Sequence, residues 1–137
     1  MTTSSTQVII LYFSRGGATQ RLADAIAEGV TAAGGEALLR TVDSDADAAS
    51  ARDMVIERDE LTRCDALLLG SPTRFGHMAS ALQKFWESTS NDWLKGVLIN
   101  KPGAVFTSTS SLHGGQETTL LSLALPLLHH GMLLTGV

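Results

Sequence analysis

Short apolar runs alternate along the chain with segments of helical periodicity. Residues 8–13 are apolar without polar alternation, which predicts a strand covered on both faces. Residues 18–33 carry apolar side chains at helical spacing and end at Gly34-Gly35, which predicts a helix. The same two patterns predict further strands at 36–42, 66–69, 104–106 and from 132, and helices at 55–61, 78–88 and 116–128.

This alternation of strands and helices predicts parallel βαβ units with right-handed crossovers. Five strands in this arrangement indicate an α/β fold, a flavodoxin-like doubly wound parallel sheet of order 2-1-3-4-5. Residues 1–137 show no repeat and no boundary, so we expect a single domain, with a polar loop at 43–50. The chain stops on the fifth strand, so we expect the C-terminal closing helix to be lacking; a fragment, an unrepresented remainder and a covering neighbour subunit stay open.

Composition narrows the classes of partner. Hydrophobic residues make up 44% and charged residues 18%, enough for one core. The net charge of −4, without a basic cluster, argues against nucleic acid and anionic membranes. The single cysteine, Cys64, excludes an intrachain disulfide and is expected to be buried and inert. Residues 1–7 show no signal peptide, and the broken apolar stretch at 120–134 falls short of the ~20 residues of a membrane span, which favours a cytoplasmic protein.

Three predicted loops follow the carboxyl ends of strands, where open α/β sheets bind ligands. The first carries two adjacent glycines between hydroxyl residues at the start of a helix, a pattern suited to a phosphate. It matches neither the dinucleotide fingerprint nor the P-loop, and an ordinary βα turn explains it equally well. The residues of the first loop are Ser14, Arg15, Gly16, Gly17, Ala18 and Thr19.

The second loop, Thr73-Arg74-Phe75-Gly76, follows Pro72 and combines a cation, an aromatic ring and a glycine. Its backbone N–H groups can address a planar heterocycle, with Phe75 as an apolar wall. Alternatively, Arg74 is a surface ion-pair partner and Phe75 fills the core.

The third loop follows the strand at 104–106 and consists of small and hydroxyl residues, which allow a ligand to approach the backbone closely. An ordinary flexible loop is the alternative. Its residues are Ser108, Thr109, Ser110, Ser111, Leu112, His113, Gly114 and Gly115, after which Gln116-Glu117 begin the next helix.

Two features near the C-terminus have more than one interpretation. His129-His130 stand at a helix end, where the dipole favours cations, and their adjacency argues against a metal pair. We favour His129 as the one near a cofactor ring. Trp93 is either a core or interface aromatic or a stacking platform. The helix at 116–128 is apolar nearly all round, so a subunit interface is the simplest explanation for it.

With these residues in view, the chain resembles the tryptophan-repressor-binding-protein (WrbA-like) family of flavodoxin-like, FMN-dependent NAD(P)H:quinone oxidoreductases. The similarity runs along the whole chain. It is strongest in Gly70-Ser71-Pro72-Thr73-Arg74-Phe75-Gly76, in Gly114-Gly115-Gln116-Glu117 and in Leu128-His129-His130-Gly131-Met132. Relatives continue some tens of residues beyond the equivalent of Val137, and their connection between strands two and three tends to be longer.

The resemblance implies FMN as the cofactor and NADH or NADPH as the co-substrate. Residues 14–19 then hold the FMN phosphate, and Thr73, Arg74 and Phe75 contact the isoalloxazine. Residues 108–114 line its other edge, and His129 contacts the ring system. Trp93 borders the pocket that nicotinamide and quinone share, whereas Gly16 replaces an aromatic that some relatives use on the nucleotide. Family members form homotetramers whose active sites draw on more than one subunit.

The leading hypothesis is therefore two-electron reduction of quinones by NAD(P)H with FMN, without a catalytic side chain or a metal site. An electron-carrier flavodoxin is the first alternative, although a modest charge and 5% aromatic residues speak against it. A flavin-free, non-enzymatic binding protein is the second.

Overall fold

A computed structural model describes residues 5–44 and 52–136, so most of the predicted loop at 43–50 lies outside the described residues. Its strands are β1 (Gln7–Tyr12), β2 (Glu36–Thr41), β3 (Met54–Val55), β4 (Ala66–Pro72), β5 (Pro102–Ser108) and β6 (Leu133–Leu134). Its helices are α1 (Ala18–Ala32), α2 (Asp59–Arg63), α3 (Ser80–Glu87), α4 (Ser90–Lys95) and α5 (Gln116–His129).

All six strands form one parallel sheet of order β3-β2-β1-β4-β5-β6. The prediction of five strands was one too few. Residues 55–61, predicted as a helix, begin instead with Val55 in edge strand β3, which pairs with Arg40 and Thr41, and only the short helix α2 follows. A two-residue strand has no periodicity of its own, so its pairing partner decides its conformation.

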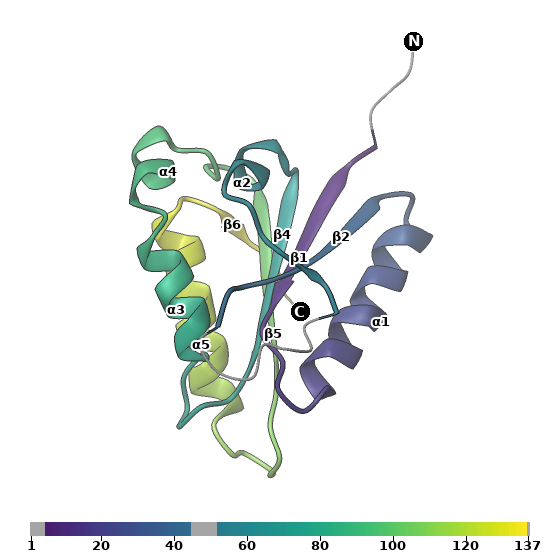
Figure 1. Ribbon diagram of the computed structural model, residues 1–137, viewed down its shortest axis with the longest axis vertical. Coiled ribbons are helices and arrows are strands. Elements are labelled where there is room, and N and C mark those ends of the chain that lie inside the picture. Colours follow the sequence, from purple (N-terminus) through teal and green to yellow (C-terminus); the bar gives the residue numbers. More distant parts are fainter. Residues whose placement is uncertain (1–4, 45–51, 137) are drawn as a thin grey trace.

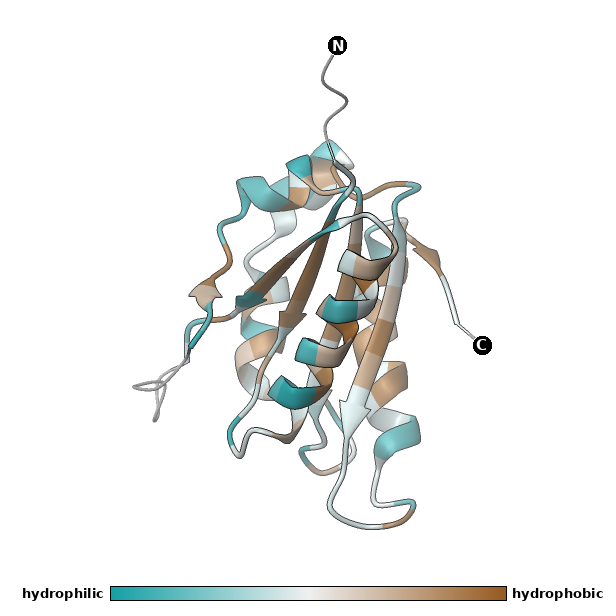
Figure 2. Ribbon diagram, turned by 90° about the vertical axis from the view of Figure 1, so that its right-hand side faces the viewer, coloured by the Kyte–Doolittle hydropathy of each residue, from teal (hydrophilic) through white to brown (hydrophobic). Residues whose placement is uncertain are grey.

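Helices cover the sheet on both faces, with α1 on one side and α3 and α5 on the other (Figure 1). The apolar strands run between them (Figure 2). Successive strand residues point to opposite faces. Ile9 and Leu11 therefore belong to the core under α3 and α5, whereas Ile10 and Tyr12 belong to the core under α1. Both faces are apolar for this reason, as the unbroken run in β1 predicts.

Glycine at position 70 lets the sheet accept a large ring. A Cβ built on Gly70 would lie 2.1 Å from Phe106 Cε2, so no side chain fits there. Phe106 of β5, 8% exposed, thus fills the core on the α1 face. The central strand β4 owes its close packing against β5 to this glycine.

Two helical segments differ from their predictions. Trp93 lies with Asn91 and Asp92 in helix α4, a segment for which the sequence pattern predicted no helix. In α5, Leu123 and Leu127 are fully buried on the sheet, whereas Leu121, Leu125 and Leu128 are at least half exposed. Within residues 5–44 and 52–136 of one chain, one side of α5 therefore stays uncovered, and the predicted subunit interface remains a prediction.

Cys64 is buried, as predicted, and its burial raises the pKa of the thiol. Within residues 5–44 and 52–136, no helix combines the length and the apolar character that a membrane crossing requires.

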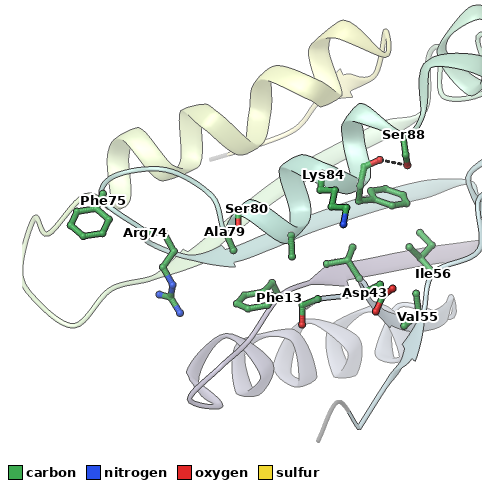
Figure 3. Close-up of a pocket in the computed structure, with 14 residues that line it drawn as sticks. Phe13, Asp43, Val55, Ile56, Arg74, Phe75, Ala79, Ser80, Lys84 and Ser88 are labelled. Atoms are coloured by element: carbon green, nitrogen blue, oxygen red, sulfur yellow. Dashed lines mark hydrogen bonds between the residues drawn. The ribbon is translucent and has the colours of Figure 1, made fainter. Parts of the chain in front are cut away.

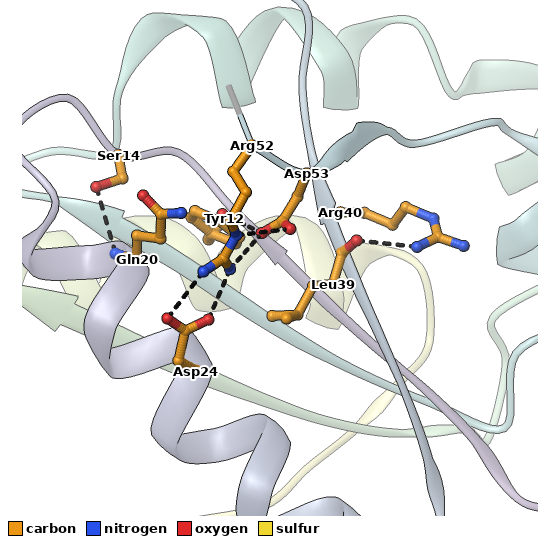
Figure 4. A network of polar contacts seen from close by, with 8 residues as sticks. All are labelled: Tyr12, Ser14, Gln20, Asp24, Leu39, Arg40, Arg52 and Asp53. Carbon is orange, nitrogen blue, oxygen red and sulfur yellow. Dashed lines mark hydrogen bonds and ion pairs between the residues drawn. The ribbon is translucent and has the colours of Figure 1, made fainter. Parts of the chain in front are cut away.

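A polar network joins α1 to the segment before β3 (Figure 4). Arg52 Nη2 donates to Asp24 Oδ1 at 2.6 Å, and Arg52 Nε donates to Asp53 Oδ1 at 3.0 Å. The Arg52 guanidinium holds the pKa of Asp53 below its usual range. The Tyr12 hydroxyl donates to the same Asp53 carboxylate. Burial, and then this hydrogen bond, raise the pKa of Tyr12 well above its ordinary value.

The Tyr12→Phe variant is expected to be about 1 kcal/mol less stable than the wild type at pH 7, because it loses the partly buried hydrogen bond to Asp53. Tyr12 is the only tyrosine of the chain. The unfolded phenol ionises near pH 10, whereas the folded one keeps its proton, so the stability that Tyr12 contributes is lost as pH rises above about 10. Urea unfolding at pH 7, 9 and 11 should show the difference between the two proteins shrinking with pH. A constant difference would contradict this assignment.

Candidate cofactor site

The carboxyl ends of β1, β4 and β5 lie at one edge of the sheet, and the three predicted loops follow them there (Figure 1). Two hydrogen bonds join the loops to one another. Thr19 Oγ1 lies 2.9 Å from Ser108 Oγ, and Thr73 N donates to Ser108 O at 3.1 Å. Ser108, predicted in the third loop, is the last residue of β5 and connects the other two loops.

The first loop leaves backbone donors open at the start of α1. Ser14 Oγ accepts hydrogen bonds from Gly17 N at 3.2 Å and Gln20 N at 3.3 Å. Within the part of the chain that the structure describes, the N–H groups of Arg15, Gly16, Ala18 and Thr19 have no hydrogen-bond partner. Gly17 precedes the helix with φ 94°, a conformation that favours glycine. Four open N–H groups at a positive helix end suit a phosphate.

The second loop is a tight turn with an exposed aromatic at its tip. Arg74 N donates to His77 O at 2.8 Å, and His77 N donates to Arg74 O at 3.1 Å. Phe75 and Gly76 between them have φ 53° and 78°. Left-handed backbone is strained for phenylalanine, and such strain collects at ligand sites.

Phe75 is fully exposed in this turn, so the interpretation of Phe75 as a core residue is wrong. The N–H groups of Thr73, Arg74 and Gly76 are engaged within the protein, so among the described residues the loop leaves only the N–H of Phe75 as a backbone donor for a heterocycle. Besides this N–H, the loop offers the ring of Phe75 and the guanidinium of Arg74, whose Nη1 donates to Thr73 O at 2.9 Å.

The third loop packs against the second through Gly115, which has φ 109°. A Cβ on Gly115 would lie 2.9 Å from Thr73 Oγ1 and 3.1 Å from Gly76 Cα. Thr119 Oγ1 also donates to Thr73 Oγ1 at 2.8 Å. The resemblance assigned only residues 108–114 to the flavin ring and left out Gly115, the residue that sets the distance between the two loops.

The outer part of the third loop is open to solvent. Thr109 Oγ1 donates to Ser111 O at 3.0 Å, and Leu112 is 89% exposed. His113 Nδ1 lies 2.8 Å from Glu117 Oε1, and this contact lowers the pKa of the Glu117 carboxyl. Ser110, Ser111 and Gly114 are exposed as well. Two exposed apolar side chains, Phe75 and Leu112, thus stand on the two loops of this edge.

These features fit FMN. The open N–H groups after β1 match a phosphate, and the hydroxyls of Ser14, Thr19 and Ser108 gather beside them. The exposed apolar side chains of the second and third loops suit the faces or edges of a flavin ring. Among the described residues, no three His, Cys, Asp or Glu side chains gather closely enough to hold a metal ion.

Trp93 and His129 lie elsewhere. Trp93 Nε1 donates to His129 O at 2.7 Å, so the two residues are neighbours. They lie at the C-terminal end of the 14-residue helix α5, about 20 Å along the axis from Gly115 and the loops. Figure 1 shows α4 and this end of α5 at the opposite end of the sheet. Within one chain, the structure does not bring these two residues to the three loops.

His130 beside them is buried, and burial lowers its pKa. Its Nε2 lies 3.0 Å from Thr89 Oγ1, which itself donates to Trp86 O at 2.7 Å. Because the single hydroxyl proton of Thr89 is used there, Nε2 of His130 is the donor. His130 is therefore a packed residue of the core, and its burial disfavours the helix-end cation that the sequence allowed.

Comparisons with known proteins agree with an FMN site. The model of the NADPH-dependent FMN reductase family matches residues 6–136. A protein named NAD(P)H dehydrogenase (quinone) from Gluconacetobacter diazotrophicus is 44% identical over 96% of this chain and 71% of its own length. One of the same name from Chromohalobacter salexigens is 42% identical with the same coverage.

Solved structures agree in fold. The crystal structure of a flavodoxin, WrbA-like protein from Agrobacterium tumefaciens has a TM-score of 0.77 at 30% identity, covering 95% of this chain and 76% of that one. A flavodoxin from the Archaea has a TM-score of 0.74 at 21% identity, covering 96% and 79%. The fold is thus flavodoxin-like, with a parallel sheet of six strands. Since the family pattern and relatives above 40% identity both extend over nearly the whole chain, the protein belongs to the family of NADPH-dependent FMN reductases.

Proposed function

We propose that this protein is an FMN-dependent NAD(P)H:quinone oxidoreductase. The overall reaction converts NAD(P)H, a quinone and one proton into NAD(P)⁺ and a hydroquinone. The observation that carries the proposal is the cluster of open N–H groups at the start of α1, joined through Ser108 to the loop that presents Phe75. The names of the relatives above 40% identity support the choice of substrates.

The chain's own residues bind and orient in this mechanism. The N–H groups of Arg15, Gly16, Ala18 and Thr19 hold the phosphate, and Ser14 Oγ keeps the loop open by bonding Gly17 N and Gln20 N. Residues 73–75 and 108–114 border the ring and limit its contact with water. When bound, FMN would supply the redox chemistry, a two-electron exchange with nicotinamide and quinone. No general base from the protein is needed.

We also propose that the protein is WrbA-like and forms a homotetramer. The motifs at 70–76, 114–117 and 128–132 and the structural similarity at 30% identity support the first point. The exposed Leu121, Leu125 and Leu128 on α5 support an interface. Because Trp93 and His129 lie far from the loops of their own chain, the cofactor that they would contact is that of another subunit.

A subunit-mixing experiment tests this arrangement. Co-assembly of a Trp93→Ala chain with a chain whose FMN loop is disabled by Gly115→Ala should restore part of the activity, because some sites combine an intact loop with an intact Trp93. Each variant alone should be at least tenfold less active than the wild type. Purely additive activity of the mixture would contradict a site shared between subunits.

Removal of the phosphate from the flavin tests the loop directly. Riboflavin should bind at least about 100-fold more weakly than FMN, because the charge-assisted hydrogen bonds from the open N–H groups to the phosphate are lost. Ser14→Ala should weaken FMN binding about tenfold without affecting riboflavin, whereas Thr31→Ala at the far end of α1 should change neither. Equal affinity for the two flavins, measured by calorimetric titration, would contradict the phosphate site.

A steady-state assay tests the activity. Purified protein with FMN should oxidise NADH or NADPH in the presence of a quinone. Reduction of the quinone should require the protein, FMN and the nucleotide. Bound flavin with a long-lived semiquinone and no quinone turnover would indicate an electron carrier. Failure of FMN to raise the melting temperature would indicate a flavin-free binding protein, because a ligand of the native state must stabilise it.

A further inference from the structure

An apolar cavity of about 760 Å³ lies next to the second loop, on the α3 side of the sheet (Figure 3). The ends of the strands and the segments that follow them form one wall, and α3 forms the other. Its apolar lining includes Phe13, Val42, Val55, Ile56, Ala81 and Phe85. Its volume and apolar lining are typical of ligand pockets.

Part of this lining is open to solvent. Val55 is 48% exposed, and Phe13 and Phe85 are only partly buried at the border of the core. Apolar surface left in water is unfavourable by roughly 25 cal/mol per Å². An apolar occupant would remove this surface from water, so the cavity favours a hydrocarbon group over a polar one.

The cavity is continuous with the proposed cofactor site. Arg74 and Phe75, which belong to the second loop, also line the cavity. A molecule whose ring lies against this loop can therefore extend along Arg74 and Phe13 into the cavity. Figure 3 shows these residues in one row, with Arg74 and Phe75 at one end and Ile56 and Val55 at the other.

The charges at the far end balance each other. Lys84 on α3 and Asp43 after β2 stand on opposite walls of the cavity (Figure 3). Arg74 adds a third charge only at the loop end, so this pair leaves the rest of the cavity without net charge, and an ionic group there gains no net attraction. The balance favours an uncharged occupant.

We propose that this cavity receives the apolar side chain of the quinone, so that the preferred substrates are quinones with an isoprenoid or alkyl tail. This inference rests on the proposed function and adds the class of substrate to it. Small quinones without a tail would use the ring site alone and leave the cavity empty.

Two neighbouring residues of β3 give a matched pair of variants. Val55 lines the cavity, whereas the side chain of Met54 points to the opposite face of the strand. Both are exposed, at 48% and 63%. Val55→Asp puts a charge on the cavity wall, and Met54→Asp puts the same charge on the same strand outside it. Neither residue belongs to the proposed cofactor site.

The experiment compares three benzoquinones as substrates of the FMN-loaded protein: one without a tail, one with a single isoprene unit and one with a decyl chain. In the wild type and Met54→Asp, kcat/KM should rise at least about tenfold from the tail-less to the decyl quinone, since each buried methylene adds to binding. In Val55→Asp this gain should fall to within about threefold, while tail-less turnover stays unchanged. Calorimetric titration with the oxidised quinones, without NAD(P)H, should show the same order of affinities.

The outcomes separate the two proposals. No reduction of any quinone would contradict the proposed function itself. Reduction without a tail preference, or equal losses in Val55→Asp and Met54→Asp, would overturn the inference on the cavity and leave the function intact. Such a result is also expected if a second copy of the chain covers the cavity.

Discussion

The Gly70→Ala variant is expected to lose about 3 kcal/mol of unfolding free energy, the largest effect of any single methyl group that we predict. The new Cβ would lie 2.1 to 2.5 Å from three atoms of the Phe106 ring. Both residues lie in the centre of the sheet, where Gly70 pairs with Phe106 across β4 and β5, so neither backbone can move away without breaking the ladder. Overpacking of this kind typically costs 1–3 kcal/mol.

Two further variants show whether the contact with Phe106 causes the predicted loss of stability. Gly29→Ala in α1 adds the same methyl group where nothing lies within 4 Å, and it should be neutral or stabilising by up to about 1 kcal/mol. Phe106→Leu should recover part of the loss when combined with Gly70→Ala, because a smaller side chain leaves room for the Cβ. Urea unfolding measures the stability of the wild type, Gly70→Ala, Gly29→Ala and the combined Gly70→Ala, Phe106→Leu protein. A Gly70→Ala protein as stable as Gly29→Ala would contradict the packing described for β4 and β5.

The Gly115→Ala variant is expected to weaken FMN binding at least about 100-fold. Its Cβ would press on Thr73 Oγ1 at 2.9 Å and on Gly76 Cα at 3.1 Å, which pushes the second loop away from the third. The proposed ring site lies between these two loops, and small displacements of binding groups have large effects on affinity. The backbone at φ 109° adds strain of about 1 kcal/mol or more.

Gly34→Ala is the matched control for that strain. Gly34 has φ 92°, but its Cβ would meet nothing within 4 Å, and it lies at the far end of α1 from the loops. Gly34→Ala should lose about as much stability as Gly115→Ala but keep wild-type affinity for FMN. Calorimetric titration with FMN, together with urea unfolding, separates the two effects. Equal FMN affinity in both variants would show that the contact between the loops does not shape the site.

Much of the fold was predictable because its central elements are long and strongly patterned. The run at 8–13 and the helix at 18–33 appear at their predicted places within one residue. β3 and α4 were missed because two and six residues are too short to show a period, so tertiary contacts decide them. The glycine at position 70 gave no signal either, since its role depends on a ring in another strand.

The candidate site was predictable in part for the same reason. Loops after parallel strands meet at one edge of the sheet, so the sequence predicted that the three loops lie together. It did not reveal that the N–H groups of Thr73 and Arg74 are already engaged. It also did not separate His129 from the loops, because a motif records order along the chain, whereas the length of α5 sets the distance. The cavity beside Phe13 combines residues from five separate segments, which no local pattern announces.

The central claim is that the three loops hold FMN in a form that exchanges electrons with both NAD(P)H and a quinone. An anaerobic experiment tests it most directly: load the protein with FMN, remove free flavin, add NADH or NADPH and follow the visible flavin absorbance. We predict rapid bleaching that a tailed benzoquinone then reverses, with one hydroquinone formed per flavin. Flavin that stays bound but oxidised after addition of either nucleotide, or bleached flavin that no quinone reoxidises, would contradict the account.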